Sequence, residues 1–120
     1  MIEVRQGASV WHEPAEGPEL ATEQDALDLI GATYGLGAEV LVVPVERFPA
    51  RFFDLHAKLI GLFFSKIVQY GYRLVLLGDV RHHVEASDAF RDVVRESDRG
   101  RDVWFVADLA ELDARLAALR

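Results

Sequence analysis

Short apolar runs alternate with amphipathic stretches along the chain, and this alternation predicts the order of strands and helices. Three runs are almost continuously apolar, as is typical of strands buried on both faces of a sheet: residues 39–45, 73–77 and 103–107. Two shorter extended segments, 2–5 and 8–12, flank Gln6-Gly7 and predict a hairpin. Apolar residues at helical spacing predict four helices, at residues 22–34, 51–70, 88–98 and 109–119.

The resulting order, β-β-α-β-α-β-α-β-α, predicts an α/β fold in a single domain over residues 1–120. The helices join strands that are too apolar to face water. We therefore expect a mostly parallel sheet of about five strands, with the antiparallel hairpin at one edge. The four helices are expected to cover this sheet in a two-layer or three-layer arrangement.

Polar residues and glycines mark the ends of the predicted helices. The side chains expected to cap free helical N–H groups are Thr22, Ser87 or Asp88, and Asp108 with Glu111 as its reciprocal partner. The residues expected to end helices are Gly35, Gly37 and Gly100. Pro44 has no N–H to donate, so strand pairing on one side of residues 39–45 must stop near it.

The predicted helix at residues 51–70 is apolar over a wide arc. Its polar residues recur at spacings of three and four and form one narrow stripe: Arg51, Asp54, Lys58, Gly61, Ser65 and Gln69. Asp54 precedes Lys58 by four residues, the order that favours a helical ion pair. The apolar remainder spans roughly 240°, whereas a face that packs on a sheet needs about 100°.

A helix that is apolar over such an arc must be covered on two sides. The second cover can come from another helix of the chain, from a second copy of the chain, or from a ligand. Because a chain of 120 residues has few elements to spare, we expect a homodimer formed through residues 50–70, with a protein partner or a small molecule as alternatives. The candidate residues for partner or ligand binding are Phe52, Asp54, His56, Phe63 and Lys66.

Two of these candidates, His56 and Lys66, fall within the apolar arc. A lysine at such a place can lay its aliphatic stem along the core and keep its ammonium group in water. A single histidine on an apolar face is more often a hydrogen-bonded core or interface residue than a ligand or a catalyst. The functional interpretation of His56 is a polar group within an apolar interface or pocket.

Charge and composition argue against several classes of function. The formal net charge is −7 at pH 7, and the arginines of stretch 91–101 alternate with acidic residues; this pattern argues against nucleic-acid binding. The chain has no cysteine, hence no thiolate ligand or nucleophile. We see no signal peptide and no run long enough to span a membrane, so we expect a cytoplasmic protein with no membrane contact. Two lysines against eleven arginines suggest a GC-rich bacterial genome.

An acidic residue follows each predicted core strand: Glu46, Asp79 and Asp108. Ligands of parallel α/β sheets bind beyond the carboxyl ends of the strands. These acids, with Arg47, Arg81, His82 and His83 nearby, are therefore candidates for metal binding or acid–base chemistry. A structural role fits better, because Asp108 is placed as a helix cap and Asp79 follows Gly78 in a turn. We expect no metal and no cofactor, and keep Glu46, Asp79 and His82 as the catalytic candidates.

Several short motifs occur in the order that is typical of one bacterial family. They are Glu46-Arg47-Phe48-Pro49, Phe52-Phe53-Asp54-Leu55, Gly78-Asp79, and Phe90-Arg91-Asp92 through Glu96-Ser97 to Gly100. The chain resembles the domain of unknown function 4180 family over nearly its whole length. It departs from the family pattern after Leu55, where a small Thr-Gly step is replaced by His56-Ala57-Lys58. The family has no established activity, so the resemblance implies a fold rather than a mechanism.

The predicted element order also resembles that of STAS domains, the regulatory interaction modules of anti-sigma-factor antagonists and anion transporters. Those antagonists are switched by phosphorylation of a Ser or Thr where the helix after the second core strand begins. This chain has Pro49-Ala50-Arg51-Phe52 at that place. The resemblance therefore implies a STAS-like fold in which that switch is absent.

Two hypotheses of function follow. The first is a non-catalytic regulatory or protein-interaction module, because the sequence has no recognisable nucleophile–base constellation. The second is a small enzyme or small-molecule-binding protein whose site lies at the carboxyl ends of the core strands, around Glu46, Asp54, Asp79 and His82.

Overall fold

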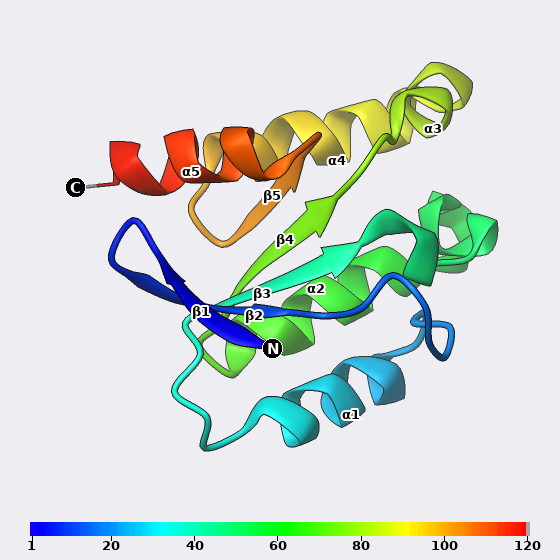
Figure 1. The fold of residues 1–120 in the computed structure, drawn as a ribbon. Helices are drawn as coiled ribbons and strands as arrows, with labels where there is room; N and C mark the ends of the chain where they lie inside the picture. Colours follow the sequence, from blue (N-terminus) through cyan, green and yellow to red (C-terminus); the bar gives the residue numbers. More distant parts are fainter. Residues whose placement is uncertain (120) are drawn as a thin grey trace.

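The chain forms a five-stranded sheet whose strands lie in sequence order, β1-β2-β3-β4-β5 (Figure 1). The computed structural model describes residues 1–119. Strand β1 is antiparallel to β2, and all other neighbours are parallel. The strands are β1 (Ile2–Arg5), β2 (Ala8–His12), β3 (Val40–Pro44), β4 (Arg73–Leu77) and β5 (Val103–Val106). The predicted α/β sheet with an antiparallel hairpin at one edge is therefore confirmed.

The helices cover the two faces of the sheet unequally. One face packs against α1 (Glu23–Thr33), α2 (Leu59–Gln69) and α4 (Asp88–Arg99), through side chains such as Ile30, Phe63 and Phe90. The other face packs against α5 (Leu109–Ala118), through Leu112 and Leu116. In Figure 1, α5 accordingly lies on the opposite side of β5 from α4. The result is three layers.

The predicted N-caps Thr22, Ser87 and Asp108 form. The Thr22 hydroxyl accepts a hydrogen bond from the Asp25 backbone N–H at 3.1 Å, and the Asp25 carboxylate accepts one from the Thr22 N–H at 3.0 Å. At the start of α4, the Ser87 hydroxyl accepts a hydrogen bond from the Phe90 N–H at 3.1 Å. Pairing of β2 with β3 ends at Val42, two residues before Pro44. Local sequence thus fixes these boundaries.

The prediction of one helix over residues 51–70 is wrong in its first half. Residues 45–57 form three single 3₁₀ turns, η1 (Val45–Arg47), η2 (Ala50–Phe53) and η3 (Leu55–Ala57), and α2 begins only at Leu59. The Asp54 carboxylate accepts the His56 backbone N–H at 3.0 Å, which favours a turn over a continuous helix. Lys58 is left-handed, with φ of 60°. Asp54 and Lys58 therefore do not lie on one helix, as the predicted ion pair between them requires.

The wide apolar arc of α2 is covered largely within the chain. Ile60, Phe63 and Ile67 are buried, at 2%, 0% and 0% exposure, because α2 lies between the sheet and its neighbours in the same helical layer. Helix α1 packs beside it, and the Lys66 ammonium lies 3.6 Å from the Glu23 carboxylate of α1. Leu62 remains 47% exposed. Another helix of the same chain thus supplies most of the second cover.

The segment after β4, where the sequence predicts no helix, contains a short one, α3 (Arg81–Ala86). Residues 1–119 therefore contain five α-helices, one more than predicted. Gly78 precedes α3 with φ of 138°, and a Cβ at this position would lie 3.2 Å from the Val45 side chain. This close approach requires a glycine where the chain leaves β4.

A cluster of phenylalanine rings holds the 3₁₀ segment on the core. Phe52 contacts Phe48 in a stacked arrangement with centroids 4.4 Å apart, and meets Phe53 and Phe63 edge to face. Phe53 continues the cluster to Phe90 of α4, at 5.3 Å. Edge-to-face and offset pairs add to the stabilisation from burial. Tertiary packing therefore fixes residues 48–53 without a regular helix.

The Arg47 side chain ties the acidic loop after β2 to the end of β3. Its guanidinium donates to the Glu13 carboxylate at 3.0 Å and to the carbonyls of Pro14 and Pro18, at 3.0 and 2.9 Å. Gly17 lies directly over it, where a Cβ would come within 2.9 Å of Cζ. Arg47 is 5% exposed, and a buried charge requires such complete pairing.

The left-handed conformation of Lys58 predicts that glycine is the better residue at this position. We expect Lys58→Gly to raise the free energy of unfolding by about 1 kcal/mol, because a non-glycine residue is strained there. The matched control is Ala57→Gly, where φ is negative and glycine is expected to lower stability by about 0.5–1 kcal/mol. Urea unfolding of both variants measures this, and a destabilised Lys58→Gly protein would contradict the assignment.

Candidate functional site

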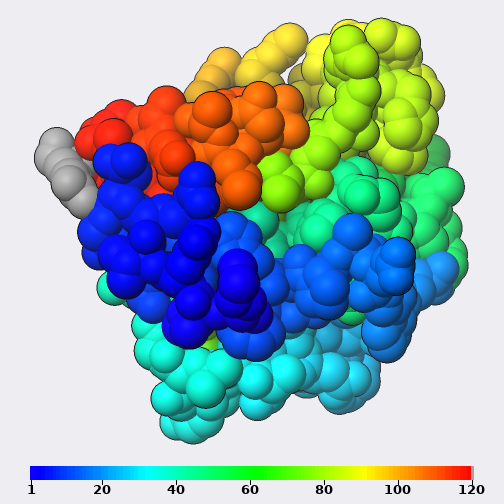
Figure 2. All heavy atoms as spheres, in the orientation of Figure 1, coloured from blue at the N-terminus to red at the C-terminus, as the bar shows by residue number. Residues whose placement is uncertain are grey.

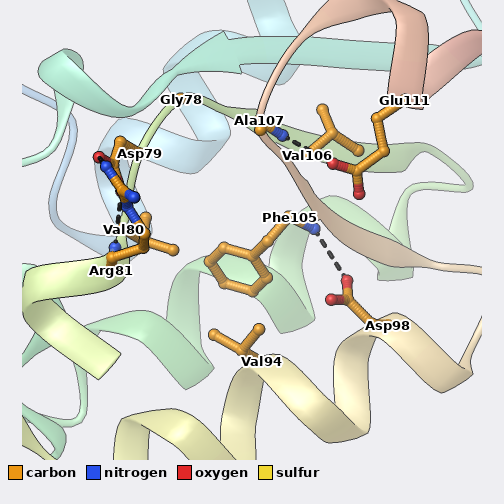
Figure 3. A pocket seen from close by; sticks show the side chains of 10 residues that line it. All are labelled: Gly78, Asp79, Val80, Arg81, Val94, Asp98, Phe105, Val106, Ala107 and Glu111. Carbon is orange, nitrogen blue, oxygen red and sulfur yellow. Dashed lines mark hydrogen bonds and ion pairs between the residues drawn. The ribbon is translucent and has the colours of Figure 1, made fainter. Parts of the chain in front are cut away.

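A groove opens at the carboxyl ends of β4 and β5, where the alternative hypothesis places a site (Figure 3). Its cavity volume is about 400 Å³. We call it the carboxyl-end groove, and its lining residues are Gly78, Asp79, Val80, Arg81, Val94, Asp98, Phe105, Val106, Ala107 and Glu111. They come from the segment after β4, from α4, from β5 and from the start of α5. Residues more than thirty positions apart therefore form one surface.

The floor of the groove is apolar. The Phe105 ring projects from β5 toward Val94 of α4, with Val80 opposite (Figure 3). Val80 and Val94 are half-buried, so part of each side chain faces the opening. Apolar surface that remains accessible in a concave site is the common basis of side-chain or ligand binding.

Asp79 and Arg81 form one wall of the groove and neutralise each other. The Arg81 guanidinium donates to both Asp79 carboxylate oxygens, to Oδ1 at 3.0 Å and to Oδ2 at 2.8 Å, and the Arg81 backbone N–H donates to Oδ1 at 2.9 Å. These hydrogen bonds from Arg81 lower the pKa of Asp79 to about 2. Asp79 therefore stays ionised and paired at neutral pH, which does not suit a general base.

The opposite wall is the free edge of β5, and carboxylates cap its N–H groups. The β4–β5 ladder uses the backbone of Trp104 and Val106, so Phe105 and Ala107 face outward. The Asp98 carboxylate accepts the Phe105 N–H at 3.0 Å, and the Glu111 carboxylate accepts the Ala107 N–H at 3.0 Å (Figure 3). Glu111 was expected to reach back to Asp108, and it binds the residue before it instead.

Arg115 links the two capping carboxylates. Its guanidinium lies 3.5 Å from Asp98 and 3.5 Å from Glu111, and it is placed over the Trp104 ring at 5.6 Å. Desolvation by burial raises the pKa of Asp98, against the opposing effects of the Phe105 N–H and Arg115. Asp98 thus gives up hydration to cap a strand edge.

The remaining catalytic candidates do not form a constellation. Glu46 is exposed, and its carboxylate lies beside Gly78, where a Cβ would be 3.6 Å away. Asp108 caps α5 by accepting the Glu111 N–H at 2.9 Å. His82 is exposed on α3, and its ring lies against that of His83 in a tilted arrangement, with centroids 3.8 Å apart. Each predicted acid is thus exposed or engaged in a local structural contact.

A second cleft lies between the 3₁₀ segment and the start of α4. We call it the histidine cleft; its volume is about 340 Å³, and it is lined by Ala50, Phe53, Asp54, Leu55, His56, His83, Ala86, Ser87 and Ala89. His83 stacks on Phe53 with centroids 4.1 Å apart, and burial lowers its pKa, with His82 adding to the effect. The sequence predicted His56 within an apolar arc, but its side chain is fully exposed and contacts Asp54 at 3.1 Å.

The other predicted binding residues lie apart from both openings. Phe52 and Phe63 are 0% exposed, so both belong to the core of this chain. Lys66 is half-buried at the contact with α1. Sequence reasoning did not find Val94 and Asp98, because both read as ordinary positions of an amphipathic helix. The one signal in the sequence is that Asp98 lies near the end of α4, shortly before the strand β5.

Charged groups of the carboxyl-end groove are thus already paired within the chain. Among residues 1–119, no group of three or more His, Asp or Glu side chains is placed to hold a metal ion. No helix in the same range is both long and apolar enough to cross a membrane. The groove offers accessible apolar surface with a neutralised rim, which suits binding of an uncharged group.

The capping role of Asp98 predicts different outcomes for two substitutions. Asp98→Ala leaves the Phe105 N–H without its acceptor and is expected to cost about 1 kcal/mol. Asp98→Asn keeps an oxygen acceptor without a charge, so we expect unchanged or higher stability at neutral pH. Urea unfolding distinguishes them, and equal losses in both variants would contradict the role.

Comparison of Asp98→Asn with the wild type also gives a pH test of this role. A carboxyl with a raised pKa in the folded state binds its proton more tightly there than in the unfolded chain, so its contribution to stability falls as pH rises from 3.8 to the raised value. Asp98→Asn lacks this contribution. The stability of the variant relative to the wild type should therefore increase across that window.

Comparisons with known proteins place the chain in a family. The sequence model of a family described as "Domain of unknown function (DUF4180)" matches residues 5–116. A search of curated proteins and a search of solved structures each returned no match. The matched region contains β2 to β5, the carboxyl-end groove and the histidine cleft. As the motifs from Glu46 to Gly100 predict, the chain belongs to the domain of unknown function 4180 family.

Proposed function

We propose that this protein is a non-catalytic regulatory interaction module whose carboxyl-end groove binds an apolar side chain of a protein partner. The observation that carries the proposal is the combination of an apolar floor with charged rim groups that are already paired. Val80, Val94 and Phe105 supply the floor, whereas Asp79 is neutralised by Arg81 and Asp98 by Arg115. A partner side chain would gain burial there without displacing an ion pair.

The ion pairs at the rim of the groove favour a binding module over an enzyme. A catalytic acid or base needs a pKa near the working pH and a free face toward substrate. Asp79, with a pKa of about 2 and a bidentate arginine, has neither. The alternative is a small-molecule-binding protein with its site at the same strand ends. Both hypotheses use the carboxyl-end groove, but in the alternative the groove recognises a charged ligand.

A STAS-like role is part of the same proposal. The element order and the sheet with a single antiparallel edge hairpin support it. The 3₁₀ segment that follows β3 carries Pro49 to Phe52, without a hydroxyl, at the place where phosphorylation switches those antagonists. Regulation of this chain would therefore rest on binding rather than on that phosphorylation.

The homodimer through residues 50–70 stays a prediction. Most of the apolar surface that motivated it is covered within the chain, and Leu62 is the large apolar side chain of α2 that remains exposed. Phe63 is not suitable for a test because it is fully buried, and a charge there would unfold the chain.

Indole, a neutral analogue of the tryptophan side chain, is the probe for the groove. In a ¹⁵N NMR titration, we expect millimolar indole to shift the backbone amides of residues 78–81, Val94 and 105–107. Val94→Arg should abolish these shifts by filling the groove with a charged side chain. The matched control is Leu62→Arg, an equal change on an exposed apolar residue outside the groove, which should leave them intact.

Charged analogues distinguish the two functions. If the groove takes uncharged side chains, indole-3-acetate and tryptamine should bind no tighter than indole. Binding of either one about tenfold tighter would favour a small charged ligand over a partner side chain. Absence of shifts in the groove with all three probes would contradict the proposal.

A further inference from the structure

The two edges of the sheet differ in whether their outward backbone N–H groups are capped. At the β5 edge, the outward N–H groups of Phe105 and Ala107 are capped by Asp98 and Glu111. Capping carboxylates of this kind prevent another strand from pairing there. At the β1 edge, no hydrogen bond from another part of residues 1–119 reaches the outward backbone groups of Ile2 or Val4. One edge is closed and the other is open.

The pairing of the hairpin determines which groups of β1 face outward. Met1 and His12 exchange backbone hydrogen bonds, and pairs two residues apart repeat this pattern, so Glu3 and Arg5 also bond to β2. The N–H and C=O groups of Ile2 and Val4 therefore point away from the sheet. Their side chains are also uncovered, at 40% and 74% exposure. In Figure 2 the N-terminal residues accordingly lie at the surface.

We propose that a second copy of this chain pairs antiparallel with the β1 edge, with Val4 of one copy opposite Val4 of the other. A two-fold axis through this pair makes the interface self-complementary. The Val4 N–H of each copy then donates to the Val4 C=O of the other, and the two sheets join into one of ten strands. This surface is separate from the carboxyl-end groove, so the inference does not depend on the proposed function.

Charge complementarity selects this register. With Val4 opposite Val4, Glu3 lies opposite Arg5 of the second copy on the face that α5 covers. Both are already held there: Arg5 by Asp113 at 2.8 Å, and Glu3 by His12 at 2.7 Å. The Glu3 hydrogen bonds from Arg5 and His12 are both to Oε1, which leaves Oε2 for the second copy. Opposite charges across neighbouring strands stabilise a pair.

The neighbouring register is disfavoured by the same residues. A shift that places Ile2 opposite Val4 brings the two Glu3 carboxylates directly opposite each other, which is destabilising. On the opposite face of the sheet, Val4 meets Val4 in the preferred register, and a β-branched pair is favourable between strands. Backbone bonds, apolar contact and charge therefore all favour the register with Val4 opposite Val4 over this neighbouring one.

Short strands make this a weak association that responds to chain concentration. Stable interfaces bury about 1,200–2,000 Å², and two four-residue strands bury less than that. Pairing at β1 leaves the carboxyl-end groove, at the opposite edge of the sheet, open on both copies. The dimer would thus present two grooves and could engage a bivalent partner more tightly than the monomer.

Sedimentation and light scattering from micromolar to millimolar chain concentration test the pairing. We expect the wild-type mass to rise from one chain toward two over this range. Val4→Lys places two ammonium groups against each other at the two-fold axis and should weaken association at least about tenfold. Leu62→Glu, a charge on the exposed face of α2, is the matched control and should leave the association unchanged.

A second variant isolates the backbone contribution. Val4→Pro removes an N–H that β2 does not use, so the hairpin should form while the pairing between copies is lost. Circular dichroism confirms folding of each variant. A wild-type chain that stays monomeric at millimolar concentration overturns the proposal. A wild-type dimer that persists in both Val4→Lys and Val4→Pro also overturns it. If Leu62→Glu alone abolishes the dimer, the interface is the exposed face of α2 instead.

Discussion

Each connection between the parallel strands crosses the sheet with the same hand, and this constraint determines where every helix lies. Because β2 to β5 are neighbours in sequence order, α1, α2 and α4 must all lie on one face. The other face is left to α5, which follows the last strand. The same order places the antiparallel hairpin at one edge and β5, flanked by α4 and α5, at the other.

This arrangement explains why α2 has such a wide apolar arc, much of which is covered within the chain. The middle helix of a three-helix layer contacts the sheet below it and helices beside it, so it needs apolar residues well beyond one face. Its sequence alone gives the width of the arc and does not identify the cover. That depends on the strand order, which sets α1 beside α2.

How far the sequence predicts this protein depends on the range of the interactions involved. The strands, the Thr22 and Ser87 caps and the hairpin follow from neighbouring residues, and their prediction is confirmed. The segment 45–58 does not, because contacts distant in sequence hold it: Arg47 with residues 13–18, and Phe52 and Phe53 with the aromatic cluster. These contacts also account for the Arg-Phe-Pro and Phe-Phe-Asp motifs as structural ones.

The position of the candidate site could be predicted from the sequence, but most of its lining residues could not. The ends of the predicted strands indicated the region around Asp79. The apolar floor of the groove could not be predicted, because Val94 and Phe105 come together only when α4 packs beside β5. Likewise, Asp98 and Glu111 acquire their capping role from the position of the sheet edge. A closed β5 edge beside a binding groove and an open β1 edge are thus two results of one topology.

Amide hydrogen exchange by NMR tests this contrast between the edges most directly. The account predicts that the Phe105 and Ala107 amides are protected at every chain concentration, because Asp98 and Glu111 hold them. The Val4 amide should exchange freely at micromolar concentration and become protected at millimolar concentration. A Val4 amide that exchanges equally fast at both concentrations, or Phe105 and Ala107 amides as unprotected as Val4, would contradict it.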